Sequence, residues 1–254
     1  MNISACGYKM KKFKALYYIF KSDFIKEFAD LKHYSFNYFI GIINQSIFCY
    51  LLIDAFSQKG ETFVNLISKF FVWYIGRDLI SEMSSSINEE KYYGTLEYIY
   101  LNTYKMEYYL LVKSLNTFLW SILFFIVISV ILFVFTSYDS RIEIGSIDIK
   151  NIILIVFSLI SFLGYGYFFA GLSLIFRKIN AFTSIFGYLI LFAQFINIDS
   201  KYSFLSFLVP GAWVKYNISF GLIGIISLFL LFTGWISFSI FLKLSTKGGS
   251  FWRV

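Results

Sequence analysis

Three residues inside an otherwise apolar stretch have the side chains and the spacing to bind or guide a ligand. Lys69, Trp73 and Arg77 follow one another at intervals of four positions, so they share one face of a helix. A charged side chain that faces lipid costs at least about 2.5 kcal/mol, and an indole ring can stack on either cation. The spacing therefore predicts a polar face turned to the protein interior, where it would line a translocation path.

The two cations differ in depth, and their roles stay open. Asp78 and Glu82 offer carboxylates to Arg77; alternatively, Arg77 and Asp78 snorkel to the nearer membrane surface. Lys69 lies deeper, about 10 Å from the outer end of the helix at a rise of about 1.5 Å per residue. It either faces a central cavity or anchors the helix at the interface.

The common catalytic patterns are absent from the sequence. There is no Gly-x-x-x-x-Gly-Lys-Ser/Thr loop, so we expect no ATP hydrolysis by this chain itself. His33 is the only histidine, which argues against a catalytic zinc site, and no Gly-x-Ser-x-Gly motif is present. Cys6 and Cys49 suggest neither a disulfide framework nor a metal site. We therefore expect no catalytic residue, no metal, no cofactor in this chain and no enzymatic activity of its own.

A second candidate site is the polar, glycine-broken segment 89–101, which lies between two apolar stretches. From Leu96 onward, side chains that could form one helical face recur at i, i+3, i+4 spacing: Leu96, Ile99, Tyr100 and Thr103. The spacing predicts a short amphipathic helix with one face on the membrane domain and the other, with Glu97, in the aqueous phase. Such a helix is typical of a contact with a soluble partner.

The composition predicts the elements that must position these residues. Of the 254 residues 58% are hydrophobic and one is proline, and the mean hydropathy is +0.70. These values lie outside the range of soluble domains and predict an all-α polytopic membrane protein. A helix needs about 20 apolar residues to cross hydrocarbon. Six segments have roughly that length: Phe36–Phe56, Thr62–Met83, Tyr109–Phe135, Ile152–Phe176, Ala181–Ile198 and Ser219–Leu242.

The distribution of basic residues predicts the orientation. The side that would hold both termini and the segment 89–101 has fifteen Lys and Arg residues, against five on the other side. Because basic residues near span ends stay cytoplasmic, we expect both termini inside and the loop 137–150 outside. The net charge of +7 then places a basic inner face against anionic lipid headgroups. No nucleic-acid-binding pattern accompanies it, so no nucleic-acid partner is expected.

The residues before the first span form a charged amphipathic stretch. From Phe13 to Leu31, apolar side chains recur at intervals of three or four and charged side chains fill the gaps. The pattern predicts a helix lying in the membrane interface; a helix packed on a soluble partner is the alternative. We divide the chain into an N-terminal arm with this amphipathic helix, residues 1–33, and a six-span membrane domain, residues 34–254.

The segment 89–101 and its flanks contain a Glu-x-x-x-Gly-Thr-Leu-Glu run, followed by Leu, Thr, Glu and Lys. The pattern is carried by Glu90, Gly94, Thr95, Leu96, Glu97, Leu101, Thr103, Glu107 and Lys113. It resembles the cytoplasmic coupling segment of ABC-2 type transporter permeases, the transmembrane subunits of ATP-driven exporters. Tyr104 and Val112 stand where family members often have Pro and Gly.

This resemblance implies an assembly in the plasma membrane. Two permease subunits, identical or related, would bind two cytoplasmic ABC ATPase subunits that hold ATP and Mg. The interfacial helix would be the family's elbow helix, and the apolar segment 203–217 around Pro210 would be its re-entrant hairpin. The coupling helix would contact the ATPase through Glu90, Gly94, Thr95, Leu96, Glu97 and Leu101. The expected cargo is hydrophobic or amphipathic, such as a toxin or antimicrobial peptide.

Two other classes remain as alternatives: a membrane protein that transports nothing, such as an immunity or assembly factor, and a channel. The sequence Leu163-Gly164-Tyr165-Gly166-Tyr167 has the letters of a potassium filter. A filter, however, is a loop after a pore helix, whereas small residues inside a span let helices approach. We therefore interpret these glycines as helix-packing positions. A bound ATPase would separate the permease from both alternatives.

Overall fold

The computed structural model describes residues 3–57, 62–102, 105–137, 149–176, 179–195, 208–210, 213 and 219–247. Its side chains are described from residue 14 onward, apart from residues 15, 57, 102 and 137. Four earlier predictions lie outside these ranges: the side chain of Cys6, Thr103 with Tyr104, the loop 138–148, and most of the expected hairpin 203–217.

All elements in the described ranges are helices. They are α1 (Ile3–His33), α2 (Ser35–Ser57), α3 (Phe63–Tyr92), α4 (Leu96–Asn102), α5 (Met106–Ser137), α6 (Ile149–Ile175), α7 (Asn180–Phe195) and α9 (Phe220–Lys247). The predicted all-α class is confirmed. The predicted second span ends at Met83, but α3 continues to Tyr92 because the polar residues that follow still favour a helix.

In the described ranges, four helices are long and apolar enough to cross a membrane. They are α2 over Ser35–Phe56, α5 over Met106–Thr136, α6 over Ile149–Ile175 and α9 over Phe220–Lys247. Large apolar side chains are exposed along all four, and a surface of that kind is stable in lipid rather than in water. The chain is therefore a membrane protein.

The count of six spans remains a prediction. The helix α3 has 30 residues but carries Lys69, Arg77 and Asp78 within its apolar part. The helix α7 has 16 residues, fewer than the roughly 20 that cross hydrocarbon without thinning the bilayer.

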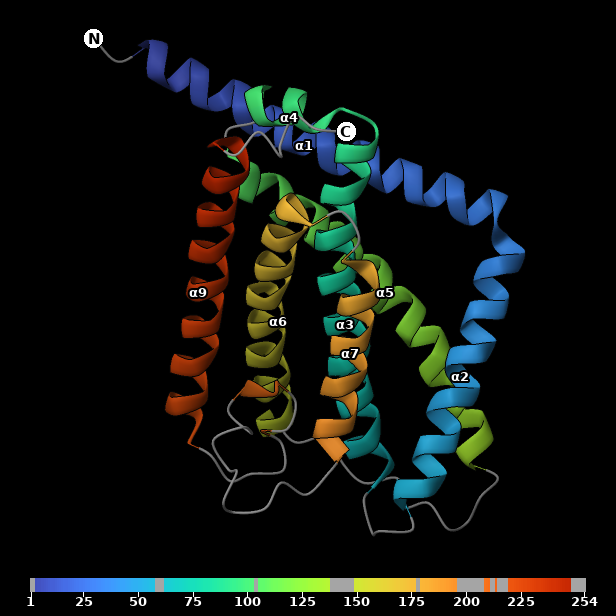
Figure 1. Cartoon of the computed structure of the whole chain (residues 1–254). Helices are drawn as coiled ribbons and strands as arrows, with labels where there is room; N and C mark the ends of the chain where they lie inside the picture. The colour runs from blue at the N-terminus through green and yellow to red at the C-terminus, as the bar shows by residue number, and fades with distance from the viewer. Residues whose placement is uncertain are drawn as a thin grey trace.

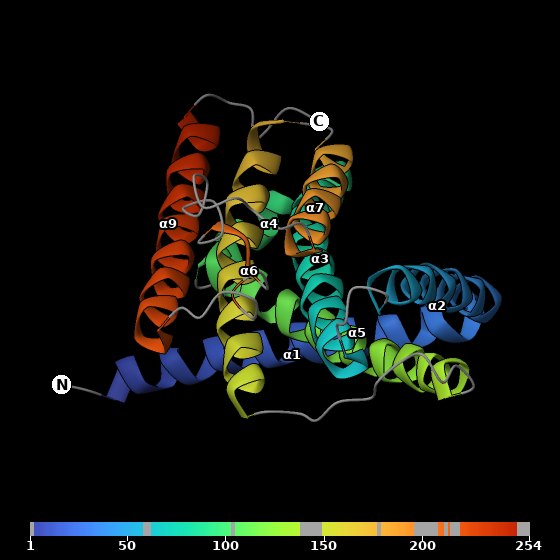
Figure 2. The ribbon, with the colours of Figure 1, turned by 90° about the horizontal axis from the view of Figure 1, so that it is seen from below.

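The helix α1 lies across one end of a bundle formed by α2, α3, α5, α6, α7 and α9 (Figure 1). The short helix α4 and the C-terminal end of α9 lie at this same end. Seen from below, α6 and α9 lie on one side, α2 lies on the other, and α3 runs between them (Figure 2). The helix α3 packs against α5, α6 and α7, so it is the central element of the fold.

Glycines bring α6 close to its neighbours. A Cβ on Gly164 would collide with the backbone of Leu230 in α9, and a Cβ on Gly234 would collide with the carbonyl of Gly164. Gly166 leaves room for the sulfur of Met83 in α3. The Gly-Tyr-Gly sequence lies within one continuous helix, so its interpretation as a packing motif is confirmed.

Candidate functional site

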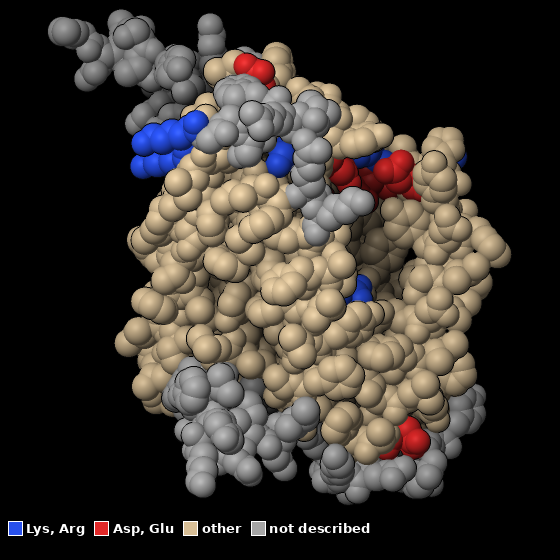
Figure 3. All heavy atoms as spheres, viewed as in Figure 1, with Lys and Arg blue, Asp and Glu red and all other residues tan. Residues whose placement is uncertain are grey.

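A cavity of about 570 Å³ lies among α1, α2, α3 and α5. On the face shown in Figure 3 the molecule is hollowed, with acidic side chains at the upper rim and a basic side chain deeper in the hollow. Aromatic and apolar side chains form part of the wall, among them Tyr38, Trp120, Phe124 and Ile128. Carboxylates from two helices also line the cavity: Glu27 of α1, and Asp78 and Glu82 of α3. It is therefore an amphipathic cavity.

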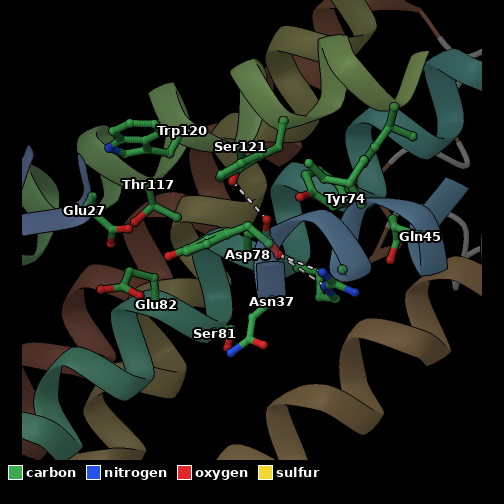
Figure 4. A pocket seen from close by; sticks show the side chains of 16 residues that line it. Glu27, Asn37, Gln45, Tyr74, Asp78, Ser81, Glu82, Thr117, Trp120 and Ser121 are labelled. Atoms are coloured by element: carbon green, nitrogen blue, oxygen red, sulfur yellow. Dashed lines mark hydrogen bonds and ion pairs between the residues drawn. The ribbon is translucent and has the colours of Figure 1, made fainter. Parts of the chain in front are cut away.

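An ion pair between neighbouring residues of α3 forms one side of this cavity. Arg77 Nη2 lies 3.0 Å from Asp78 Oδ1, and Ser121 Oγ of α5 donates to Asp78 Oδ2 at 2.9 Å (Figure 4). The guanidinium carbon lies 5.0 Å from the centre of the Trp73 ring and 5.5 Å from that of Tyr74. Arg77 is thus held by an anion and two aromatic faces, which is one of the two alternatives that the sequence left open.

A second cavity of about 170 Å³ continues toward α1 and shares Glu27, Tyr38, Glu82 and Thr117 with the first. Its other lining residues are Asp23, Lys26, Asp30, Glu89, Lys113 and Asn116. The Lys113 Nζ atom lies 2.8 Å from Asp23 Oδ1, an ion pair that joins α5 to α1. The two cavities together place α1, α2, α3 and α5 around a polar interior.

Two carboxylates lie near each other on one side of the larger cavity, below Trp120 in Figure 4: Glu27 and Glu82. Burial raises the pKa of Glu27 above its ordinary value, and the charges of Glu82 and Asp30 raise it further. The cations Lys26 and Lys113 act in the opposite direction. Glu82 accepts a hydrogen bond from Ser86 Oγ at 3.0 Å. A negative field therefore builds up at this end of the cavity.

Several buried polar atoms around the two cavities have no hydrogen-bond partner among the residues that the structure describes. They are the acceptors Asp23 Oδ2 and Asn116 Oδ1 and the donor Trp120 Nε1. The Asn116 side chain is 3% exposed, and an unmade hydrogen bond at a buried group costs about 1–3 kcal/mol. Unpaired buried groups of this kind call for a functional explanation.

The three residues predicted for the translocation path do not converge on this cavity. Arg77 lines it. Lys69 is buried, 3% exposed, with its ammonium 5.3 Å from the centre of the Phe195 ring in α7. Trp73 is also buried and donates from Nε1 to the Gly187 carbonyl of α7 at 2.8 Å. Lys69 and Trp73 thus share a face that packs on α7, and Arg77 extends from it toward the cavity.

The predicted coupling segment begins with a tight turn that ends α3. The Gly94 N–H donates to the Lys91 carbonyl at 3.2 Å and the Thr95 N–H to the Glu90 carbonyl at 2.9 Å. This pair of bonds defines a Schellman motif, which needs a left-handed residue, and Gly94 supplies it with a φ of 70°. The glycine of the Gly-Thr-Leu-Glu run is therefore required by the backbone.

Side chains fix the same turn to the bundle. Thr95 Oγ1 is hydrogen-bonded to the Glu90 carboxylate, whose other oxygen accepts from Tyr109 OH of α5 at 2.8 Å. Lys91 Nζ donates to the Leu174 carbonyl at the end of α6 at 3.0 Å. The turn is consequently tied to α5 and α6 as well as to α3.

The short helix α4 has one buried and one exposed face, but the predicted buried face is only partly right, because Tyr100 is 39% exposed. Leu96 is buried and packs in a cluster with Ile99 at its edge. Glu97 is exposed, and Tyr98 and Leu101 are 70% and 69% exposed. The six predicted coupling residues therefore divide: Glu90, Gly94, Thr95 and Leu96 build and anchor the segment, whereas Glu97 and Leu101 form part of its open face.

Three residues of the cavities were not predicted from the sequence as site residues: Glu27, Asn116 and Trp120. Glu82 was expected only as a partner for Arg77. One feature of the sequence could have predicted the side of the cavity that α5 forms. Polar or aromatic side chains recur at helical spacing in a predicted span, at Lys113, Asn116, Thr117, Trp120, Ser121 and Phe124. A polar stripe inside a span faces protein or water rather than lipid.

Comparison with known proteins gave no match: no family model, curated protein or solved structure is similar to this chain.

Proposed function

We propose that this chain is the permease subunit of an ABC-2 type exporter. It would move a hydrophobic or amphipathic substrate, such as a toxin or antimicrobial peptide, out of the cytoplasm across the plasma membrane. A separate ATPase subunit would bind ATP and Mg and supply the energy. The functional unit would contain two permease subunits, identical or related, and two ATPase subunits.

The observation that carries this proposal is the construction of α4 and its turn. An exposed short helix is held on the bundle by Leu96 on its buried face and by the Glu90–Tyr109 and Lys91–Leu174 hydrogen bonds. A segment that transmits force needs an outer face for a partner and a stiff attachment to the spans. The combination of exposed Glu97 and Leu101 with an anchored turn suits that role.

The arrangement of the other helices supports the same proposal. The helix α1 lies across the α4 end of the bundle, as an elbow helix at the inner membrane surface would. The helices α3 and α7, added to the four apolar helices, would complete six spans. We assign the α1 end to the cytoplasm because Lys91, Lys105 and Lys247 are at that end, and basic residues stay inside.

Copurification tests the proposal directly. The tagged chain would be solubilised from its native membranes in mild detergent, and its bound subunits identified by mass spectrometry. The expected result is an ATPase subunit in a 1:1 ratio and ATP hydrolysis by the complex. A chain that purifies without any ATPase from membranes in which it is functional would contradict the proposal and favour a non-transporting factor or a channel.

The orientation has its own test. In a chain without its natural cysteines, Ser140→Cys should react with a membrane-impermeant thiol reagent in intact cells. Ser250→Cys should react only after the cells are opened. The reverse pattern would overturn the assignment of both termini to the cytoplasm.

A further inference from the structure

The two connected cavities carry a surplus of negative charge in a chain whose net charge is +7. Their lining includes six carboxylates, from Asp23, Glu27, Asp30, Asp78, Glu82 and Glu89, against the three cations Lys26, Arg77 and Lys113. Two of the cations are engaged in ion pairs, Arg77 with Asp78 and Lys113 with Asp23. The Glu27 and Glu82 carboxylates have no ion pair within the described ranges and lie on one side of the larger cavity (Figure 4).

Hydrogen-bond acceptors outnumber donors at the same place. Within the described part of the chain, Asp23 Oδ2 and Asn116 Oδ1 are buried without a hydrogen-bond partner, and Asn116, at 3% exposure, lines the smaller cavity. The amide oxygen of Asn116 carries no charge, so its need for a hydrogen-bond donor is independent of the surplus of carboxylates. Both kinds of group would be satisfied by a ligand that donates several hydrogen bonds.

The shape and lining of the cavity define the rest of such a ligand. The described carboxylates do not come together closely enough to hold a metal ion, which favours an organic cation. Beyond Glu27 and Glu82, the α5 side chains Trp120, Phe124 and Ile128 form an apolar part of a wall that also contains polar residues, among them Asn37, Gln45 and Ser81. This apolar part suits an apolar chain. The rings of Tyr38 and Trp120 stack on Phe124, with 5.5 and 6.1 Å between ring centres, and extend this apolar surface.

We infer that this cavity binds a cationic amphiphile, with a protonated primary amine between Glu27, Glu82 and Asn116 and its apolar chain along Trp120, Phe124 and Ile128. The site stands independently of the proposed export, because binding requires neither ATP nor a partner chain. The same chemistry has two sources: the ethanolamine headgroup of a membrane lipid, or a soluble amphiphilic amine.

Binding of dodecylamine to the purified full chain in phosphatidylcholine nanodiscs tests the inference. The Trp120 indole, in the wall of the cavity, reports binding by its fluorescence. We expect saturable binding of dodecylamine, with at least about tenfold weaker binding of dodecyltrimethylammonium, which cannot donate hydrogen bonds, and of dodecanol, which has no charge. Equal affinities for the three probes would overturn the inference without the need for any variant.

Variants locate the site. The double variant Glu27→Gln with Glu82→Gln keeps the side-chain shapes and should weaken dodecylamine binding at least about tenfold, since hydrogen bonds to charged groups are the stronger ones. The control is Asp54→Asn, which removes a carboxylate of α2 outside both cavities and should bind like wild type. Unchanged affinity in a folded double variant, shown by wild-type helix content and elution volume, would refute the assignment.

The lipid composition of the nanodiscs distinguishes the two sources of the ligand. In nanodiscs that contain phosphatidylethanolamine, a lipid ligand would compete and raise the apparent Kd for dodecylamine in wild type but not in the double variant. A Kd that is the same with and without this lipid assigns the site to a soluble amine. Failure of copurification with an ATPase would leave these binding results unaffected.

Discussion

Gly164 on α6 and Gly234 on α9 meet backbone to backbone, so that a Cβ on Gly234 would collide with the Gly164 carbonyl. The two helices make the most extensive contact in the fold. Small residues allow this closeness in membranes, where helix association depends on van der Waals packing. The pair therefore sets the distance between α6 and α9.

Gly234→Ala should destabilise the protein by about 1–3 kcal/mol, the usual effect of overpacking. The neighbour is backbone and cannot rotate away. The measurement is the thermal unfolding midpoint in detergent. Gly221→Ala, on the same helix with no atom within 4 Å of the added carbon, is the control and should unfold like wild type. A Gly234→Ala midpoint equal to that of the control would show that α6 and α9 can separate freely.

Gly94→Ala should destabilise the turn before α4 by about 1–2 kcal/mol, because a left-handed conformation strains any residue with a Cβ. No atom lies within 4 Å of the added carbon, so the effect comes from the backbone alone. Limited proteolysis between α3 and α5 measures it, with faster cleavage expected in the variant. Gly94→Asn should be cleaved more slowly than Gly94→Ala, since Asn tolerates this conformation better. Identical cleavage rates in all three proteins would rule out a backbone requirement at this position.

Glu97→Lys should reduce substrate-stimulated ATP hydrolysis at least about fivefold, the lower end of typical coupling effects. The residue lies on the exposed face of α4, and Leu96 still anchors the helix. Membrane abundance and copurification of the ATPase should stay at wild-type levels. Export at an unchanged rate would remove the reason for placing the partner contact on this face.

The ion pair of Arg77 and Asp78 should show strong coupling in a double-mutant cycle. Each single variant, Arg77→Gln or Asp78→Asn, leaves a partly buried charge without its partner. Because the two side chains are 26% and 23% exposed, we expect each to lose about 1–3 kcal/mol, less than the 3–5 kcal/mol of a fully buried pair. The double variant should recover part of this loss. Additive losses in chemical unfolding would show that the two charges do not stabilise each other.

Lowering the pH should have opposite effects on the two properties that depend on Glu27: its contribution to stability should rise, and the affinity for dodecylamine should fall. Its folded-state pKa is raised, mainly by burial and then by Glu82 and Asp30. Its stabilising contribution is therefore fully present below the unfolded-state pKa and is lost as the pH rises through the folded-state pKa. Above that range, Glu27→Gln should be more stable than wild type, and the difference should vanish at lower pH.

Dodecylamine affinity should fall as the pH drops through the same range, since protonated Glu27 no longer attracts an ammonium group. Other ionisable groups also lie near Glu27: Asp30 and Lys26 on the same helix, Glu82 on α3, Lys113 on α5 and Tyr38 on α2. The comparison with Glu27→Gln separates the contribution of Glu27 from that of these neighbours. A pH profile shared by the two proteins would assign the effect elsewhere.

The helices could be predicted from the sequence because each long apolar run needs a helix to satisfy its backbone in lipid. The run from Phe36 to Phe56 differs from α2 by one residue at each end. The end of α3 could not be placed in this way, since the polar residues after Met83 end the apolar run but continue the helix. The turn at Gly94, a residue with positive φ, marks the true end.

The cavity was beyond prediction for a different reason. Its wall comes from α1, α2, α3 and α5, and helical spacing relates residues only within one helix. Spacing placed Lys69, Trp73 and Arg77 on one face correctly, yet it could not show that this face packs against α7, where Arg77 also lies beside Gly187. Glu27 belongs to the charged side of the predicted interfacial helix. The spacing of residues within that helix cannot predict that Glu82 of α3 lies close to it.

The turn at Gly94 joins α4 directly to the end of α3, so a displacement of α4 would tilt α3. At a rise of about 1.5 Å per residue, about 22 Å of helix separates Tyr92 from Arg77, so a tilt of about 5° about one end moves the other by about 2 Å. The hydrogen bonds of Glu90 and Lys91 keep the turn from absorbing such a tilt as local bending. A push on α4 would therefore change the width of the cavity, where the Arg77 side chain forms part of the wall.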